Sequence, residues 1–351
     1  MHNTEWLSLT SEELREKLKS LGEAPFRADQ LSKWFCLGAL PDEMTNSPKS
    51  LREKLSDRQT GLLFYPKIVK KQVSVLDSTV KYLFEMHDGQ LIESVVMKYE
   101  HGNTICVSTQ AGSLMGCKFC ASTLGGKVRD LSAGEILGQI ISAQRDFGER
   151  ISGIVMMGIG EPLDNYDNVM KFLKIVGSKS SLNIGYRHIS LSTCGLVDKI
   201  RRLAEESYPI TLSISLHAAC DEDRSSIMPV NNKWNIDSLL NACRDYFDKT
   251  GRRISFEYTL ISGKNDSVAQ AKKLAQLIKK YFASRPVHIN LIPLNHVDER
   301  GFSAGSKEDV KAFCDTLNAL HVNATVRRRL GPDIDASCGQ LRHKAFGTQG
   351  S

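Results

Sequence analysis

Long hydrophobic segments are missing from this chain of 351 residues. No apolar run approaches the roughly 20 residues that cross a bilayer, and the polar N-terminus, from Met1 to Thr10, does not resemble a secretory signal. Both absences lead us to expect a cytoplasmic protein. The chain also lacks any repeat of solenoid length and any low-complexity segment, which excludes a repeat architecture.

What the chain contains is ordinary for a globular protein. Its residues are 41% hydrophobic and 25% charged, and its length suffices for one large domain and a small one. Nine cysteines in a chain of this kind indicate free thiols or metal ligands, not a disulfide framework. The net charge of +6 permits a polyanionic partner without requiring one. We expect a monomer by default.

Residues 1–85 are predicted to form a separate, mainly helical N-terminal domain. Helical periodicity covers Ser11–Leu21 and Ala28–Phe35. A third short helix is expected over Pro48–Leu55, with Ser47 as its N-cap and Pro48 at the first helical position. The alternating segment Tyr65–Glu85 predicts strands that lead into the main domain.

Residues 86–345 are predicted to form an α/β core in which strands and helices alternate. Strands are expected at Thr104–Ser108, Gly153–Met157, His188–Ser192, Ile210–Leu216, Arg253–Leu260, Val287–Leu294 and Ala324–Arg328, and helices at Ala133–Arg145, Tyr166–Val176, Val197–Glu206, Ile236–Thr250, Ser267–Phe282 and Lys307–Leu320. Ser132 opens the first of these helices with a capping box. About six βα units are fewer than a full eight-fold barrel, so we predict a partial (β/α)6-type barrel.

In such barrels the chemistry lies at the carboxyl ends of the strands, and the unusual residues of this chain fall there. The expected strand ends carry Gly158-Ile159-Gly160-Glu161-Pro162, Ser192-Thr193-Cys194-Gly195, Ser215-Leu216-His217-Ala218 and Pro293-Leu294-Asn295. A cysteine loop follows the first barrel strand. We therefore expect five polar or glycine-rich strand ends to converge on one mouth.

The cysteine loop contains Cys117 and Cys120, which fit the frame C-x-x-x-C-x-x-C with Ser113 in place of the first cysteine. Three thiolates on one loop can hold three irons of a [4Fe–4S] cluster and leave the fourth open. Zinc would need a second cysteine pair, which the sequence lacks. A thioredoxin-like redox pair or two buried structural cysteines would also account for Cys117 and Cys120.

Each remaining candidate also has a structural interpretation. Gly160 and Glu161 could form a tight strand-to-helix turn, or a close backbone approach with a carboxylate or carbonyl for an amine ligand. Small polar residues at strand ends, such as Ser192 and Ser215, are more often structural. In structural terms, His217 would be a satisfied core histidine, Cys338 a surface thiol and Cys106 a buried small hydrophobe.

Together these residues resemble a known family. The segments CVSTQAGSLMGCKFCASTLGG, MGIGEP, STCG, ISLHA, NLIPLN and GPDIDASCGQLR are similar to those of the RlmN family of radical S-adenosylmethionine (SAM) RNA adenine-C2 methyltransferases. The resemblance covers nearly the whole chain. The sister family Cfr, which methylates adenine C8, differs after the last cluster cysteine.

The resemblance implies a role for each matching residue. The implied cluster ligands are Cys117 and Cys120. The implied catalytic residues are Cys338, which is methylated, Cys106, which is its partner thiol, and Glu93, which is the catalytic carboxylate. The implied SAM-binding residues are Gly160, Glu161, Ser192, Ser215, Leu216, His217 and Asn295.

In this family one SAM methylates the cysteine, and a radical from a second SAM activates the methyl group. The implied cofactors are therefore a [4Fe–4S] cluster and SAM, which supply the radical route that the non-nucleophilic C2 carbon needs. A base removes the C2 proton, and the partner thiol releases the product as a disulfide forms. The implied partners are 23S rRNA, the tRNA anticodon loop and a reducing partner such as a flavodoxin-type electron donor.

Ser113 is the departure from the family pattern. A serine oxygen is harder than a thiolate and a poor iron ligand. We therefore expect weak or absent cluster binding and little methylation by this chain. The sequence also leaves open a non-catalytic RNA-binding homologue and a Cfr-type C8 methyltransferase.

Overall fold

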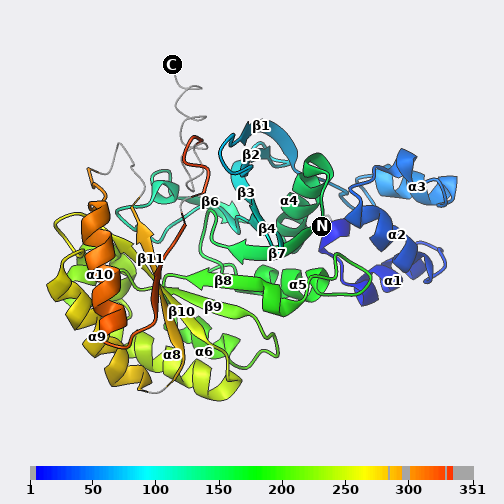
Figure 1. The fold of residues 1–351 in the computed structure, drawn as a ribbon. Coiled ribbons are helices and arrows are strands. Elements are labelled where there is room, and N and C mark those ends of the chain that lie inside the picture. Colours follow the sequence, from blue (N-terminus) through cyan, green and yellow to red (C-terminus); the bar gives the residue numbers. More distant parts are fainter. Residues whose placement is uncertain (1–4, 284, 295–300, 329, 335–351) are drawn as a thin grey trace.

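A ten-stranded mixed sheet organises the computed structural model, which describes residues 5–283, 285–294, 301–328 and 330–334. The strands follow the order β1-β2-β3-β4-β7-β8-β9-β10-β11-β12 (Figure 1). Their bounds are β1 Lys67–Val73, β2 Val80–Glu85, β3 Leu91–Tyr99, β4 Gly102–Cys106, β7 Ile151–Met156, β8 Ile189–Thr193, β9 Thr211–Ser215, β10 Ile254–Leu260, β11 Val287–Pro293 and β12 Ala324–Val326.

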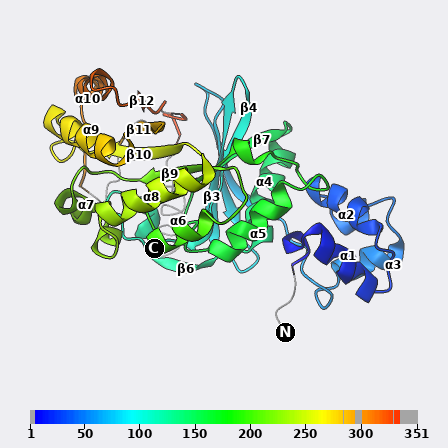
Figure 2. The same cartoon turned by 90° about the horizontal axis from the view of Figure 1, so that it is seen from below.

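In this sheet the strands β4, β7, β8, β9, β10, β11 and β12 pair in parallel and form the predicted partial barrel. Helices connect them along the outside of the curved sheet (Figures 1 and 2), as right-handed βα connections require. They are α4 Ala133–Phe147, α5 Tyr166–Val176, α6 Val197–Leu203, α7 Asp221–Ile227, α8 Ile236–Thr250, α9 Val268–Phe282 and α10 Lys307–Ala319. All seven predicted strands and all six predicted helices of this half are confirmed.

The first helix of the barrel begins as its sequence predicts. The Ser132 side chain accepts a hydrogen bond from the backbone N–H of Glu135, and the Glu135 carboxylate accepts one from the backbone N–H of Ser132. This reciprocal box satisfies two backbone donors that would otherwise lack partners at the helix start.

The N-terminal helices pack beside the barrel next to α4 and α5 (Figure 2). They are α1 Ser11–Ser20, α2 Arg27–Cys36 and α3 Lys49–Ser56. The predicted start of the third helix is wrong by one residue: Pro48 is the N-cap, with ψ 150°, and the helix begins at Lys49. The extended ψ suits the residue before a helix, so the proline stands one step earlier than expected.

The domain boundary predicted at residue 85 falls within the sheet, between strands β2 and β3. Strands β1 and β2 pair antiparallel with each other, and β2 pairs antiparallel with β3, which extends the barrel sheet at its β4 edge. The helical part of the N-terminal region therefore ends before β1, and the hairpin β1–β2 shares its sheet with the barrel.

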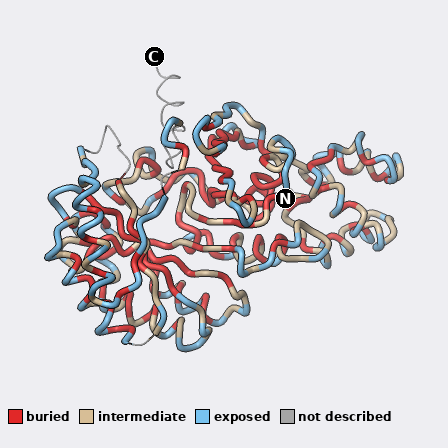
Figure 3. Tube along the Cα trace, in the orientation of Figure 1, coloured by how far each residue is buried: buried red, intermediate tan, exposed pale blue. Residues whose placement is uncertain are grey.

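The core lies between the sheet and its helices, and along the N-terminal helices where they meet α4 (Figure 3). Every residue of β10 is buried because both faces of this central strand are covered, whereas buried and partly buried residues alternate along β8. Within the described residues, no helix is both long and apolar enough to span a membrane.

Candidate active site

A cavity of about 220 Å³ lies at the carboxyl ends of the barrel strands. Eight residues singled out in the sequence line it together: Ser113, Cys117, Cys120, Gly160, Glu161, Ser192, Ser215 and His217. They come from the cysteine loop and from the ends of β7, β8 and β9. Four of the five expected strand ends therefore converge on this cavity; of the fifth, Pro293 and Leu294 do not line it, and Asn295 lies outside the described residues.

The cysteine loop is built on a small two-stranded sheet of β5 Gln110–Gly112 and β6 Lys127–Asp130, which the sequence did not predict. Gly112 has φ +89°, and a Cβ there would lie 1.8 Å from the carbonyl oxygen of Gly126, so only glycine fits. The Thr123 hydroxyl donates to the carbonyl of Cys117 at 3.1 Å and to that of Cys120 at 3.0 Å. These contacts fix the backbone of both cysteines.

Ser113 shares the cavity wall with the two cysteines and is buried. Its backbone N–H donates to the Gly126 carbonyl at 3.0 Å, so it occupies a defined place at the loop entrance. The three loop positions thus offer two thiols and one hydroxyl to a common space. Cys117 and Cys120 suit an iron–sulfur cluster, whereas the Ser113 oxygen does not.

The two thiols differ in their surroundings. Cys117 is buried, and this burial raises the pKa of its thiol to about 12, although the guanidinium of Arg224 acts in the opposite direction. Cys120 is only partly buried. A metal must displace the thiol proton to bind, so cluster assembly at Cys117 would release a proton.

A buried hydroxyl group in the cavity wall indicates a polar ligand. Ser122 lines this cavity, and its hydroxyl is buried without a hydrogen-bond partner among the described residues. An unsatisfied buried hydroxyl is costly unless something pairs with it. A polar cofactor such as SAM would offer that partner.

Glu161 holds the turn after β7 with its side chain. Its two carboxylate oxygens accept the backbone N–H groups of Cys194 at 2.8 Å and Leu163 at 3.0 Å, and burial raises its pKa. Gly160 next to it has φ +104°, and a Cβ there would lie 2.8 Å from the backbone nitrogen of Gln110. The turn therefore needs this glycine, and the carboxylate ties it to the end of β8.

His217 follows β9 with φ +56° and is almost completely buried. Its Nδ1 accepts the backbone N–H of Thr259 at 2.9 Å, and its ring meets that of Phe119 edge to face at 4.9 Å between centroids. Burial lowers the pKa of His217 to about 3, so the imidazole is neutral near pH 7. Phe119 belongs to the cysteine loop, so His217 supports that loop directly.

Leu216 is the one described SAM-binding candidate that does not line the cavity; it packs in the core instead. Its carbonyl accepts a hydrogen bond from Arg224 at 3.1 Å. Two further candidates, Asn295 and Cys338, lie outside the described residues.

Glu93 and Cys106 lie on strands next to the cavity. In the antiparallel pairing Lys81 faces Val95, and Val95 faces Cys106. Directly opposed residues point to the same side of a sheet, and so does the second neighbour along a strand. Lys81, Glu93 and Cys106 therefore share one face. Cys106 forms a cluster there with Val95 and Met97, and Met157, which also lines the cavity, packs against this cluster.

Two buried cations near this site were not predicted from the sequence. The ammonium group of Lys81 pairs with the Glu93 carboxylate at 2.8 Å. Arg224, fully buried on α7, donates to the carbonyls of Cys194 at 2.7 Å and Ser215 at 3.1 Å. The one available signal was the lysine inside the apolar run VKYLF, which needs a buried partner; Arg224, on a helix, carries no such signal.

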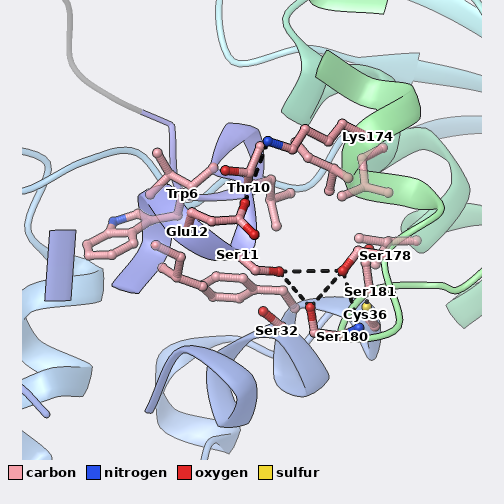
Figure 4. A pocket seen from close by; sticks show the side chains of 17 residues that line it. Trp6, Thr10, Ser11, Glu12, Ser32, Cys36, Lys174, Ser178, Ser180 and Ser181 are labelled. Atoms are coloured by element: carbon pink, nitrogen blue, oxygen red, sulfur yellow. Dashed lines mark hydrogen bonds and ion pairs between the residues drawn. The ribbon is translucent and has the colours of Figure 1, made fainter. Parts of the chain in front are cut away.

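A smaller cavity of about 90 Å³ lies between the N-terminal helices and the end of α5 (Figure 4). The Ser11 hydroxyl is 2.7 Å from that of Ser180, which in turn is 2.9 Å from that of Ser178. These serines already pair with one another, and none of the candidate site residues lines this cavity. It is a gap between the helical unit and the barrel, bridged by hydroxyl groups.

Two family models match the chain. The model of the radical SAM superfamily matches residues 107–275, and that of the ribosomal RNA large subunit methyltransferase N-terminal domain matches residues 4–60. The first covers the cysteine loop and the strand ends around the cavity, and the second covers the three N-terminal helices.

Similar proteins extend over the full length. A probable dual-specificity RNA methyltransferase RlmN from Clostridium perfringens is 51% identical, with 98% of each chain covered. One from Alkaliphilus oremlandii is also 51% identical, covering 98% of this chain and 99% of the relative. The crystal structure of a radical SAM methyltransferase from Sphaerobacter thermophilus has a TM-score of 0.91 at 41% identity, covering 96% of this chain and 98% of that one.

Proposed function

Because the chain belongs to the RlmN family of radical SAM methyltransferases, we propose that its site is built to methylate C2 of adenosine in 23S rRNA and in the tRNA anticodon loop. The observation that carries the proposal is the shared cavity of Ser113, Cys117 and Cys120 beside the strand ends, with the cluster that contains Cys106 packed against Met157 of its wall. These parts correspond to the cofactor side and the thiol side of one reaction.

The cofactors have distinct places in this arrangement. Cys117 and Cys120 would hold a [4Fe–4S] cluster, and the strand ends at Gly160, Ser192 and Ser215 would hold SAM. Bound together, they supply the radical chemistry that an electron-poor ring carbon requires. The turn at Gly160 lets the backbone come close to such a ligand.

Glu93 is the proposed base for the C2 proton. Its carboxylate is buried and paired with Lys81 at 2.8 Å. A carboxylate held in place within reach of a reacting carbon is a common general base. The pair also fixes the direction of the carboxylate, so the proton is taken at a defined atom.

Two cysteines carry the methyl group and release the product. The thiol of Cys338 takes the methyl group and joins it to the base. The Cys106 thiolate then attacks the Cys338 sulfur, and the bond from that sulfur to the carbon carried on adenine breaks with its electron pair going to the carbon. That carbon takes up a proton and becomes the methyl group of the product, and a Cys106–Cys338 disulfide remains. Cys106 is the last residue of β4 and is buried, so the sheet holds this thiol at a defined place.

Ser113 is proposed to limit the cluster binding and the activity of this chain. With a hydroxyl at the first ligand position, the loop would bind a cluster weakly or not at all, and methylation would be slight or absent. The other motif residues keep the family pattern, so replacing this one side chain is proposed to restore the site.

The N-terminal domain, residues 1–85, is proposed as an accessory RNA-binding unit, together with basic residues near the site. Arg327 lines the cavity, and Arg328 follows it in the chain. Guanidinium groups bind phosphates well, and single-stranded RNA offers unstacked bases to such a site. A flavodoxin-type electron donor, a monomeric state and a cytoplasmic location complete the proposal.

Product analysis tests the proposal. The chain and a Ser113→Cys variant are reconstituted anaerobically with iron and sulfide and incubated with SAM, a reductant, and transcripts of tRNA and 23S rRNA. The RNA is then digested, and its nucleosides are identified by mass spectrometry. We expect 2-methyladenosine from the variant and little from the unaltered chain.

Different products would change the conclusion. If 8-methyladenosine formed instead, the chain would be a C8 enzyme. RNA binding without any product, in a variant that holds a full cluster, would identify a non-catalytic RNA-binding homologue.

A further inference from the structure

We propose that Ser108 is a positioning residue that joins the proposed base, Glu93, to the turn after β7, residues 158–162. The inference rests on the proposed function, which makes Glu93 the base for the C2 proton. Ser108 is fully buried and does not line the cavity, so it touches no reacting atom. Its role is to fix the distance between the strand that carries the base and the SAM side of the site.

The hydroxyl of Ser108 bridges two backbone segments. It donates to the carbonyl oxygen of Glu93 at 2.7 Å, and it accepts the backbone N–H of Ile159 at 3.0 Å. Glu93 belongs to β3, whereas Ile159 stands next to Gly160 in the turn after β7. A single hydroxyl group therefore connects the strand of the proposed base with the turn of the proposed SAM site.

Strand register brings Ser108 to this place. The pairing of β3 with β4 ends where Val95 faces Cys106, and two residues further along each segment Glu93 comes opposite Ser108. Ser108 lies beyond the end of β4, and its hydroxyl, not its backbone N–H, reaches the Glu93 carbonyl. The side chain thus continues the contact with β3 after the ladder of backbone hydrogen bonds has stopped.

Gln139 on α4 holds both backbone polar groups of Ser108. Its Oε1 accepts the backbone N–H of Ser108 at 2.9 Å, and its Nε2 donates to the Ser108 carbonyl at 2.9 Å. The same Oε1 accepts the Ser94 hydroxyl at 2.9 Å. Gln139 and Ser108 are both fully buried. Satisfied buried networks of this kind rigidify a core, so Ser108 is a firm support for the two segments that it joins.

The turn after β7 lies close against Ser108. The backbone N–H of Gly158 donates to the Val107 carbonyl at 3.1 Å, and a Cβ on Gly158 would lie 2.8 Å from the backbone nitrogen of Ser108. Gly158, Gly160 and Glu161 line the cavity. Loss of the Ser108 hydroxyl would therefore loosen the wall of the proposed SAM site together with the strand that carries the base.

Two contacts thus act on Glu93. The ion pair with Lys81 at 2.8 Å holds its carboxylate, and the hydrogen bond from Ser108 holds its backbone. A general base must lie within hydrogen-bond reach of the proton that it takes, and a misplacement of about 1 Å can slow a reaction about a hundredfold. The Ser108 bridge therefore contributes to the rate without taking part in the bond changes.

Hydrogen–deuterium exchange tests the bridge in the unaltered chain, without a cluster. The chain is compared with Ser108→Ala and with Ser94→Ala, which removes a buried hydroxyl from the same network but leaves the bridge from Glu93 to Ile159 in place. We expect Ser108→Ala to speed the exchange of the Ile159 amide about tenfold. Ser94→Ala should leave that exchange unchanged, and thermal unfolding checks that both variants fold.

Steady-state kinetics tests the positioning role in the Ser113→Cys background. With Ser108→Ala added, we expect kcat for 2-methyladenosine formation to fall about tenfold to a hundredfold while KM for RNA stays unchanged. RNA that carries deuterium at C2 of the target adenosine gives the isotope effect on kcat. This ratio should rise, because removal of the C2 proton becomes the slower step. It does not depend on how much of the enzyme is folded, so a merely structural loss would leave it unchanged.

The outcomes separate the bridge from the proposed function. If Ser108→Ala leaves the exchange of the Ile159 amide unchanged, the hydroxyl does not hold the turn. If kcat falls without a change in the isotope effect, or if Ser94→Ala raises the isotope effect equally, Ser108 has no positioning role although the proposed function stands. If the Ser113→Cys chain forms no 2-methyladenosine, the proposed function fails, and the role of Ser108 fails with it.

Discussion

Lys81 and Glu93 form an ion pair at 2.8 Å in which both side chains are almost completely buried, at 0% and 3% exposure. They sit diagonally across β2 and β3, on the face that also carries Cys106. A buried pair of this kind contributes little net stability, but removing one partner is strongly destabilising because the other charge stays buried. Because the pair lies on the same face as Cys106, the Glu93 carboxylate is in a position to serve the proposed reaction.

Replacing Lys81 by Met tests this pair. The change removes the cation next to the buried Glu93 carboxylate, so we expect the free energy of unfolding to fall by about 3–5 kcal/mol. In a cluster-competent background, methylation should also be lost. Urea unfolding measures the first effect and nucleoside analysis the second.

The control is Lys98→Met, which removes an exposed pair with Glu149 at 2.7 Å. Exposed pairs contribute at most about 1 kcal/mol. Equal destabilisation by the two lysine substitutions would show that the Lys81–Glu93 pair has no special role.

Gly160→Ala should damage the turn at the cavity. Its backbone has φ +104°, and the added Cβ would lie 2.5 Å from the Cβ of Gln110 and 2.8 Å from the Gln110 backbone nitrogen. Backbone strain and overpacking together should cost about 3 kcal/mol or more. Gly148→Ala is the matched control, because Gly148 also has a positive φ but has nothing within 4 Å. There we expect a loss of only about 1 kcal/mol.

Chemical denaturation of the two glycine variants gives the comparison. A loss at Gly160 no larger than that at Gly148 would mean that the turn has room for a side chain. It would also remove the argument for a close approach of the backbone to a ligand at this strand end.

His217 predicts a pH dependence of stability. Its pKa is about 3 in the fold and about 6.5 in the unfolded chain, so the unfolded state binds more protons between these values. Stability from this group is therefore complete above pH 6.5 and falls as the pH falls towards 3. Between pH 7 and pH 5 the contribution should drop by about 2 kcal/mol.

His217→Asn removes the titration but keeps an acceptor for the backbone N–H of Thr259. Between pH 7 and pH 5, the free energy of unfolding of the unaltered chain should fall by about 2 kcal/mol more than that of the variant. Urea titrations at the two pH values measure the difference. The same pH dependence in both proteins would contradict a neutral, buried imidazole.

Much of the barrel follows from local patterns in the sequence. The strand and helix periods are strong in the parallel half, because covered strands become apolar runs and outer helices keep one apolar face. Strand β3 was not predicted, since Glu93 and Ser94 interrupt its apolar residues. The β5–β6 pair, which has three and four residues, depends on the glycine at position 112 and on contacts that no local pattern shows.

Part of the candidate site could also be predicted from the sequence. Strand ends of a parallel sheet converge by topology, so the gathering of Ser192, Ser215 and His217 could be expected. The partners of buried charges could not, because Lys81 and Glu93 meet only through strand register. Leu216, chosen by its place in a motif, directly follows β9 and packs in the core, while its neighbours Ser215 and His217 line the cavity.

The most direct test is the iron content of the cysteine loop. The unaltered chain, a Ser113→Cys variant and a Ser122→Cys control are reconstituted anaerobically with iron and sulfide. Ser122 lines the same cavity but stands outside the ligand frame. Iron per chain and absorption near about 400 nm report the cluster. We predict about four irons only with cysteine at position 113; a full cluster in the unaltered chain would contradict the account.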